Sequence, residues 1–271
     1  MKDVLQKKVQ GISDASKKYH LLREGLQHLV LKILDEEGFF KYVCFLGGTA
    51  LRVVYDLRRF SEGIDFSLQI PQDPRFDFQK MLVALRDRLE VYGLPIDTKI
   101  KEVGAVRSVF LRFKDILQEL DVVKRKGQKL AIKVEVDTNP PLSAGLESHL
   151  IQKDFLFTVI HHDLPTLCSG KLLAFLFRGY TKGRDLYDLI WFLTRKTPVN
   201  KVFLENGLLQ ATGHRLSWTL EDLLKKLDEK IESLEMDVVI QDAKPFLEEE
   251  SEIRFLDKEL LKPLVKNLSL V

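Results

Sequence analysis

Cysteines, long apolar runs and a targeting signal are scarce or missing in this sequence. Its 271 residues include two cysteines, Cys44 and Cys168, in apolar surroundings that are typical of buried thiols rather than of disulfides or zinc ligands. The longest apolar runs, such as residues 172–177, are far shorter than the roughly 20 residues that cross a bilayer. The first residues lack the apolar segment and cleavage site of a secretory signal. We therefore expect a cytoplasmic protein without a membrane span.

An excess of one charge is missing as well. The 42 Lys and Arg residues against 40 Asp and Glu residues give a formal net charge of +2. So small a balance does not support non-specific binding to nucleic acid, and any nucleic-acid site has to be local. The 45% of hydrophobic residues is enough for one sizeable core or two modest ones.

The order of the apolar patterns predicts an α+β fold. Alternating and short continuous apolar runs indicate strands at residues 42–46, 63–68, 108–113, 130–137 and 155–160. Apolar spacings of three and four residues indicate helices at residues 6–37, 49–55, 79–92, 171–178, 185–194 and 219–234. Because the elements beyond Leu164 are mainly helical, we expect a mixed core over residues 1–164 and a mainly helical domain over residues 165–271.

One stretch of the sequence carries residues suited to phosphate chemistry. Gly47 and Gly48 join a predicted strand to a predicted helix, where the backbone can approach a polyphosphate and the first helical amides can bind an anion. Asp65 lies on the next predicted strand, a rigid support of the kind that a magnesium-binding carboxylate needs. A Gly-Gly pair alone is more often a tight turn. Its combination with Asp65 favours a nucleotide site.

These residues resemble the AbiEii/AbiGii toxin nucleotidyltransferases, a family that includes the MenT-type toxins and belongs to the polymerase-beta-like superfamily. The family pattern is Gly-Gly-Thr-Ala-Leu after a hydrophobic strand, then Arg-x-Ser-x-Asp-Ile-Asp-Phe, and later a lysine and an Arg/Lys-Asp-x-x-Asp helix. Residues 47–51, 59–66, 171 and 184–188 match it in order, so the resemblance covers roughly residues 43–195. It implies a nucleotidyltransferase fold, a mixed sheet flanked by helices, with residues 165–271 completing the active site.

One position departs from the family pattern. Gly63 stands where the family has the first aspartate of Asp-x-Asp. The loss of a carboxylate weakens magnesium binding and the alignment of the triphosphate, so we expect a weakened or inactive chain. The intact residues around Gly63 favour an inactivating substitution, natural or engineered. Glu62 lies on the opposite strand face under regular alternation, and replaces the missing ligand only through a bulge.

The resemblance assigns roles to the remaining motif residues. Catalytic roles fall on Asp65, Lys171, Asp185 and position 63, and nucleotide binding on Gly47, Gly48, Thr49, Arg59, Ser61 and Asp188. The residues themselves leave alternatives. Ser61 could cap the turn, and Lys171 could be a surface lysine. Asp185 and Asp188 share one side of a helix, where they could orient Lys171, contact the nucleotide or pair with neighbouring bases.

The resemblance also implies a third acidic residue, which in the superfamily usually comes from a neighbouring strand. Glu135 and Asp137 share one face of the strand at residues 130–137. We choose Asp137 as the metal ligand beside Asp65, because it borders the loop at residues 139–141. A surface salt bridge explains either acid equally well. The expected cofactor is Mg²⁺ or Mn²⁺.

Two other clusters leave their roles open. The sequence His161-His162-Asp163 looks like a metal triplet, but neighbouring strand residues point to opposite sides, which favours a structural turn. The basic run at residues 124–129 could bind an RNA backbone or form a solvated hairpin tip.

The resemblance implies a toxin that transfers a nucleoside monophosphate from a nucleoside triphosphate to an RNA acceptor, such as the 3′ end of a tRNA. It also implies a cognate antitoxin protein as partner. Two alternatives stay open. One is a non-catalytic module that binds nucleotide or RNA, which Gly63 supports. The other is transfer to a protein hydroxyl, because the same fold also modifies proteins.

Overall fold

The computed structural model describes residues 1–123, 127–180 and 182–271. They form two compact units. The first, here called the sheet unit, comprises residues 1–56, 60–140 and 148–161. The second, the helical unit, comprises residues 57–59, 141–147 and 162–271. Within the described residues, no helix combines the length and apolarity needed to cross a membrane.

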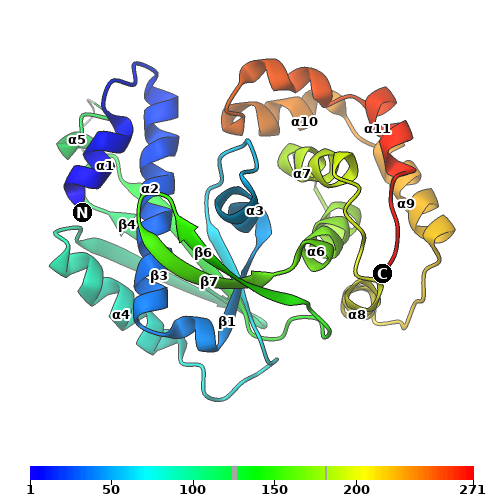
Figure 1. The fold of residues 1–271 in the computed structure, drawn as a ribbon, viewed down its shortest axis with the longest axis horizontal. Helices are drawn as coiled ribbons and strands as arrows, with labels where there is room; N and C mark the ends of the chain where they lie inside the picture. Colours follow the sequence, from blue (N-terminus) through cyan, green and yellow to red (C-terminus); the bar gives the residue numbers. More distant parts are fainter. Residues whose placement is uncertain (124–126, 181) are drawn as a thin grey trace. The chain divides into compact units, whose positions relative to one another are not determined.

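A mixed seven-stranded sheet lies at the centre of the sheet unit (Figure 1). The strands are β1 (Val43–Leu46), β2 (Ile64–Leu68), β3 (Ile96–Val103), β4 (Val106–Phe113), β5 (Leu130–Asp137), β6 (Leu146–Gln152) and β7 (Leu156–His162). Their order is β3-β4-β5-β2-β1-β7-β6. Strand β1 pairs antiparallel with β2 and parallel with β7, and β2 pairs parallel with β5. The β6–β7 hairpin belongs to this sheet, although residues 146–147 at the start of β6 and His162 at the end of β7 group with the helical unit.

Helices cover the sheet and confirm the expected α+β class. They are α1 (Lys2–Val9), α2 (Ala15–Glu36), α3 (Gly47–Tyr55), α4 (Phe78–Val91) and α5 (Ile116–Glu119), with a 3₁₀ turn η1 (Phe39–Lys41). The single helix predicted over residues 6–37 is wrong: Gly11, at φ +78°, breaks it into α1 and α2. Asp14 then caps α2 by accepting a hydrogen bond from the Lys17 amide at 2.8 Å.

Two strands have no counterpart among the predicted elements. Strands β3 and β6 are the two edges of the sheet, and most of their side chains are exposed. An exposed edge strand does not need alternation between apolar and polar residues, so it leaves little signal in the sequence. Strand β5, in contrast, alternates between buried and half-buried residues along its whole length and was predicted with the observed bounds.

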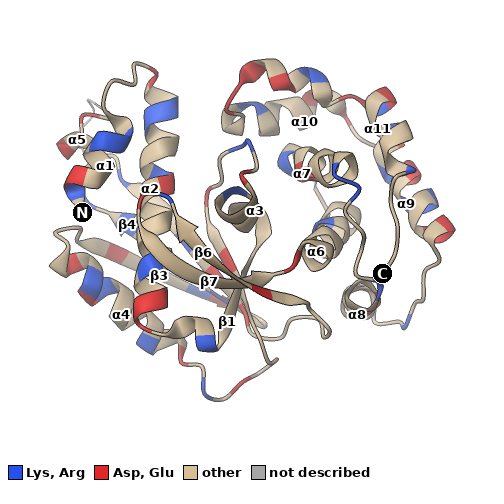
Figure 2. Ribbon diagram, viewed as in Figure 1, with Lys and Arg blue, Asp and Glu red and all other residues tan. Residues whose placement is uncertain are grey.

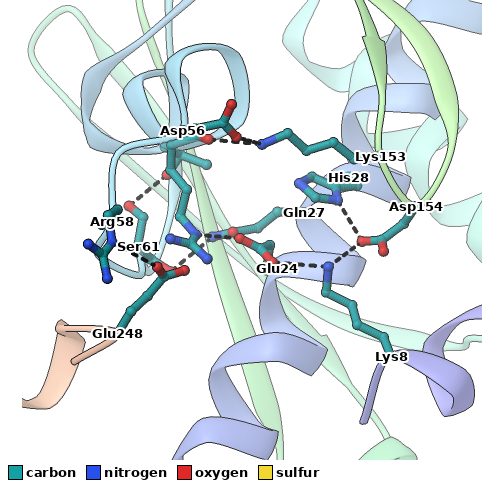
Figure 3. A network of polar contacts seen from close by, with 12 residues as sticks. Lys8, Glu24, Gln27, His28, Asp56, Arg58, Ser61, Lys153, Asp154 and Glu248 are labelled. Atoms are coloured by element: carbon teal, nitrogen blue, oxygen red, sulfur yellow. Dashed lines mark hydrogen bonds and ion pairs between the residues drawn. The ribbon is translucent and has the colours of Figure 1, made fainter.

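A buried polar network joins α1, α2, α3 and the turn between β6 and β7 (Figure 3). Asp154 Oδ2 lies 2.7 Å from Lys8 Nζ and 2.6 Å from His28 Nδ1. Glu24 pairs with Lys8 at 3.0 Å and with Arg52. Burial alone would raise the pKa of both carboxyls, but their cationic neighbours outweigh it, lowering the pKa of Glu24 and bringing that of Asp154 to about 2.

The described part of the helical unit is built from α6 (Leu164–Phe177), α7 (Gly183–Thr194), α8 (Lys201–Thr212), α9 (Leu220–Glu232), α10 (Met236–Ala243) and α11 (Lys258–Val265), with 3₁₀ turns η2 (Lys244–Phe246) and η3 (Glu250–Phe255). Asp163 caps α6, because its carboxylate accepts a hydrogen bond from the Thr166 amide at 2.9 Å. Thr219 and Asp222 form a capping box at the start of α9. These caps fix where α6 and α9 begin.

Candidate active site

In the sheet unit, the glycine turn and the carboxylate of Asp65 lie against each other. Gly47 opens α3 with φ +80°, directly after β1. Leu46 is in register with Asp65 on β2. A Cβ atom built on Gly47 would lie 2.5 Å from Asp65 Oδ2, a separation that real Cβ atoms do not tolerate. The glycine therefore leaves the space that Asp65 occupies, and it places this carboxylate beside the first amides of α3.

Thr49 and Ser61 hold the loop that leads into β2. Thr49 is 1% exposed; its hydroxyl donates to the Gly63 carbonyl oxygen and lies at hydrogen-bond distance, 2.7 Å, from Ser61 Oγ. Gln27 Nε2, on α2, donates to the carbonyl oxygens of Ser61 and Gly63 at 3.2 and 3.3 Å. Gln27 was not predicted from the sequence, although a polar residue within the leucine-rich face of a helix indicates a buried hydrogen-bonding role. These contacts hold the backbone of the motif in place.

Position 63 is closely packed against the neighbouring strand. A Cβ atom at Gly63 would lie 2.8 Å from the carbonyl oxygen of Lys133 on β5. Because this neighbour is backbone, any side chain at position 63 requires a shift between β2 and β5. The local structure is thus suited to glycine, and the expected loss of activity at this position stays a prediction.

Three carboxylates share one face of β2 and β5. Asp65 is in register with Glu135, and Ser67 with Asp137, and in-register partners project from the same face. Glu135 also pairs with Lys133 Nζ at 2.7 Å. Asp137 Oδ1 accepts a hydrogen bond from the Asn139 amide at 2.9 Å, while burial raises the pKa of Asp137. By this register Glu135, rather than Asp137, is the acid of β5 nearer to Asp65. Carboxylate oxygens of this kind are ligands that suit Mg²⁺ or Mn²⁺.

In the helical unit, Asp188 holds two cations. Arg59 donates from Nε and Nη2 to the two oxygens of Asp188, both at 2.6 Å. Lys171 Nζ lies 2.7 Å from Asp188 Oδ2. Asp188 is fully buried and the Arg59 side chain is 3% exposed. The predicted nucleotide-binding residues Arg59 and Asp188 are therefore occupied with each other, and Asp188 orients Lys171.

Asp185 stands next to this group. Its Oδ1 lies 3.3 Å from Lys171 Nζ, and its Oδ2 lies 3.3 Å from Arg178 Nε. Arg178 follows α6 and was not singled out in the sequence, which gave no signal to distinguish it from other surface arginines. Arg184 pairs instead with Asp242 at 3.4 Å. Among the roles predicted for Asp185 and Asp188, the geometry supports the orientation of Lys171, because both carboxylates contact its Nζ.

Burial and charge compete in this cluster. Burial alone would lower the pKa of Lys171 and Arg59, but the carboxylate of Asp188 outweighs it and raises both. Burial alone would raise the pKa of Asp188, but Arg59 and Lys171 outweigh it and lower the pKa. All three groups are therefore charged at neutral pH, with Lys171 held as a fixed cation. More widely, basic and acidic residues are interspersed along the elements of each unit (Figure 2).

Two further clusters were considered in the sequence, and the structure describes one of them in full. The structural turn at residues 161–163 is wrong, because His161 and His162 end β7 and Asp163 caps α6. The alternation argument holds: His161 contacts His149 at 2.7 Å, whereas His162 packs edge-on against Phe203. In the basic run at 124–129, residues 124–126 lie outside the described residues.

Comparison with known proteins agrees with the sequence motifs. The family model described as nucleotidyl transferase AbiEii toxin, type IV toxin-antitoxin system, matches residues 29–259. A solved structure of a candidate nucleotidyltransferase from H. pylori is similar in fold, with a TM-score of 0.55 and 18% identity over 91% of this chain and 92% of that chain. JHP933 from Helicobacter pylori matches at a TM-score of 0.48 and 20% identity over 92% of this chain and 88% of that chain.

No curated protein matches the chain. The family match is nevertheless decisive, since it spans most of the sequence and includes the glycine turn, Asp65, Lys171 and the helix with Asp185 and Asp188. The chain belongs to the AbiEii family of nucleotidyltransferase toxins.

Proposed function

We propose that this chain binds a nucleoside triphosphate with a divalent metal and transfers its nucleoside monophosphate to an RNA acceptor, the 3′ end of a tRNA. The observation that carries the proposal is the approach of Gly47 to the carboxylate of Asp65. A phosphate-binding helix start and a metal-binding acid then serve one polyphosphate. A cognate antitoxin is the expected protein partner.

Each group in the proposal has a defined task. The amides at the start of α3, from Gly47 to Thr49, bind phosphate oxygens. Asp65, together with Glu135 or Asp137, would hold Mg²⁺, which neutralises charge on the triphosphate. Lys171 adds a fixed positive charge to the transferred group. Asp185 and Asp188 keep that lysine charged and oriented, and Arg59 holds Asp188 in place.

Gly63 sets the expected level of activity. With Asp65 as the remaining acid of the Asp-x-Asp motif, metal affinity and alignment of the triphosphate are reduced. The proposed enzyme is therefore slow compared with a chain that has both aspartates. The competing proposal, a module that binds nucleotide or RNA without turnover, also rests on Gly63. Transfer to a protein hydroxyl is the third candidate.

The test compares the unmodified chain with Asp65→Asn. Each protein is incubated with labelled nucleoside triphosphates, Mg²⁺ and either total tRNA or a protein extract. We expect label on tRNA with the unmodified chain and at least about a hundredfold less with Asp65→Asn, comparable to the loss of one preorganised electrostatic group. Asp228→Asn is the matched control, because Asp228 is exposed on α9.

The outcomes separate the three candidates. Label on protein in place of tRNA supports the protein-modifying alternative. Absence of label with both chains, together with equal binding of triphosphate, supports the binding module. Equal labelling by the unmodified chain and Asp65→Asn would contradict the assignment of Asp65 as a metal ligand.

A further inference from the structure

A second cluster of potential metal ligands lies on the β6–β7 hairpin. Glu147 and His149 are two residues apart on β6 and so share one face of that strand, and His161 lies on β7. One ligand atom from each of the three lies within 4.8 Å of the others. The closest pair is His149 Nδ1 and His161 Nε2, which are 2.7 Å apart. Three donor atoms thus converge on one point.

The surroundings fix one side of this cluster and leave the other open. His161 is fully buried, whereas His149 and Glu147 are exposed. Tyr55, at the end of α3, packs edge-on against both imidazoles, with ring centroids 6.1 Å from His149 and 5.7 Å from His161. The buried imidazole is therefore held in place, and the exposed pair can adjust to an ion that arrives from solvent.

The cluster is separate from the carboxylates of β2 and β5. Asp65 is in register with Leu46 of β1, while His161 is in register with the preceding residue, Phe45. Neighbouring residues of a strand point to opposite faces, and in-register partners share a face. Asp65 and His161 therefore project from opposite faces of the sheet, and one ion cannot serve both.

We propose that Glu147, His149 and His161 bind Zn²⁺. Two imidazole nitrogens and one carboxylate oxygen are a donor set that Zn²⁺ favours, whereas Mg²⁺ prefers oxygen ligands alone. One nitrogen of this pair donates to the other, and Zn²⁺ binds both nitrogens once the donor imidazole carries its proton on its other ring nitrogen. In a tetrahedral site they separate to about 3.3 Å, which the exposed His149 allows.

The ion would act as a cross-link between the edge strand β6 and its neighbour β7. Three protein ligands leave the fourth position of a tetrahedral ion to water. Because the ion binds the folded hairpin, it should raise the thermal stability of the chain. This inference does not depend on nucleotidyl transfer, so it can fail or hold independently of the proposed function.

The test uses the full chain after removal of metal with EDTA and dialysis. Calorimetric titration with Zn²⁺ alone should give one ion per chain, and Co²⁺ as a spectroscopic probe should show the visible absorption of a tetrahedral site. His149→Ala should weaken Zn²⁺ binding by at least about tenfold and abolish the rise in melting temperature. His149 is exposed, so this variant should fold.

His214→Ala is the matched control, since His214 is also exposed but lies between α8 and α9. It should bind Zn²⁺ like the unmodified chain. Glu147→Gln provides a second variant and should weaken binding while both imidazoles stay in place. Failure of the unmodified chain to bind Zn²⁺, or equal binding by His149→Ala, would overturn the proposal.

Discussion

At Gly47 a hydrogen atom takes the place of a side chain and lets Asp65 approach the start of α3. Two separate restraints act on this residue. Its φ of +80° disfavours any L side chain, and a Cβ atom would lie 2.5 Å from Asp65 Oδ2. The proposed phosphate binding and metal binding thus depend on the same missing side chain.

Gly47→Ala should lower the free energy of unfolding by about 1–3 kcal/mol, because it adds backbone strain and displaces Asp65. Urea denaturation measures this change. Gly170→Ala is the control, since Gly170 lies in α6 and, apart from its chain neighbours and its own helix backbone, no atom lies within 4 Å of its Cβ position. There alanine should stabilise by up to about 1 kcal/mol. Equal stability of the two variants would contradict the restraint at Gly47.

Gly63 allows steric and chemical effects to be separated. Alanine and aspartate at this position place the same Cβ atom 2.8 Å from the Lys133 carbonyl oxygen, but only aspartate adds a carboxylate. Both variants should be destabilised by about 1–3 kcal/mol. In the transfer assay, Gly63→Asp should exceed Gly63→Ala if the carboxylate restores a metal ligand. Equal rates would show that an aspartate at position 63 does not act as a metal ligand in this chain.

At the scale of single elements, α7 is anchored through Asp188. Asp188→Asn removes the negative charge that both Arg59 and Lys171 contact, and the more distant Asp185 compensates these buried cations less well. We expect a loss of about 3–5 kcal/mol in the free energy of unfolding. The same measurement on Asp228→Asn should show almost no change. A loss below about 1 kcal/mol for Asp188→Asn would mean that the cations find other partners.

The turn between β6 and β7 should make the free energy of unfolding decrease at acidic pH. The pKa of Asp154 is lowered to about 2 from an ordinary value near 3.8. A depressed carboxyl pKa stabilises the fold above the unfolded value and loses this contribution as pH falls towards 2. The melting temperature of Asp154→Asn should therefore fall less steeply between pH 4 and pH 2 than that of the unmodified chain. Thermal melts across that range measure the difference. Parallel curves for both proteins would contradict the assignment.

The sequence allowed the prediction of elements that bury an apolar face, and of motif residues close together along the chain. Strand β5 shows its alternation in full, and the glycine turn with Asp65 lies within about twenty residues. Edge strands β3 and β6 carry little apolar pattern. Contacts across long separations, such as Arg59 with Asp188, depend on packing that periodicity does not encode. The His149–His161 pair was missed because His149 lies on edge strand β6, which was not predicted.

At the scale of the whole molecule, membership in a toxin family predicts an effect on growing cells. Induced expression of the unmodified chain should slow growth, and we expect a partial effect because Gly63 stands where the family pattern has a proposed metal-binding aspartate. Asp65→Asn should grow normally at equal protein level, while Asp228→Asn should behave like the unmodified chain. Growth curves with quantified expression measure this. If Asp65→Asn slowed growth equally, toxicity would arise from binding rather than transfer, and the non-catalytic module would become the better description.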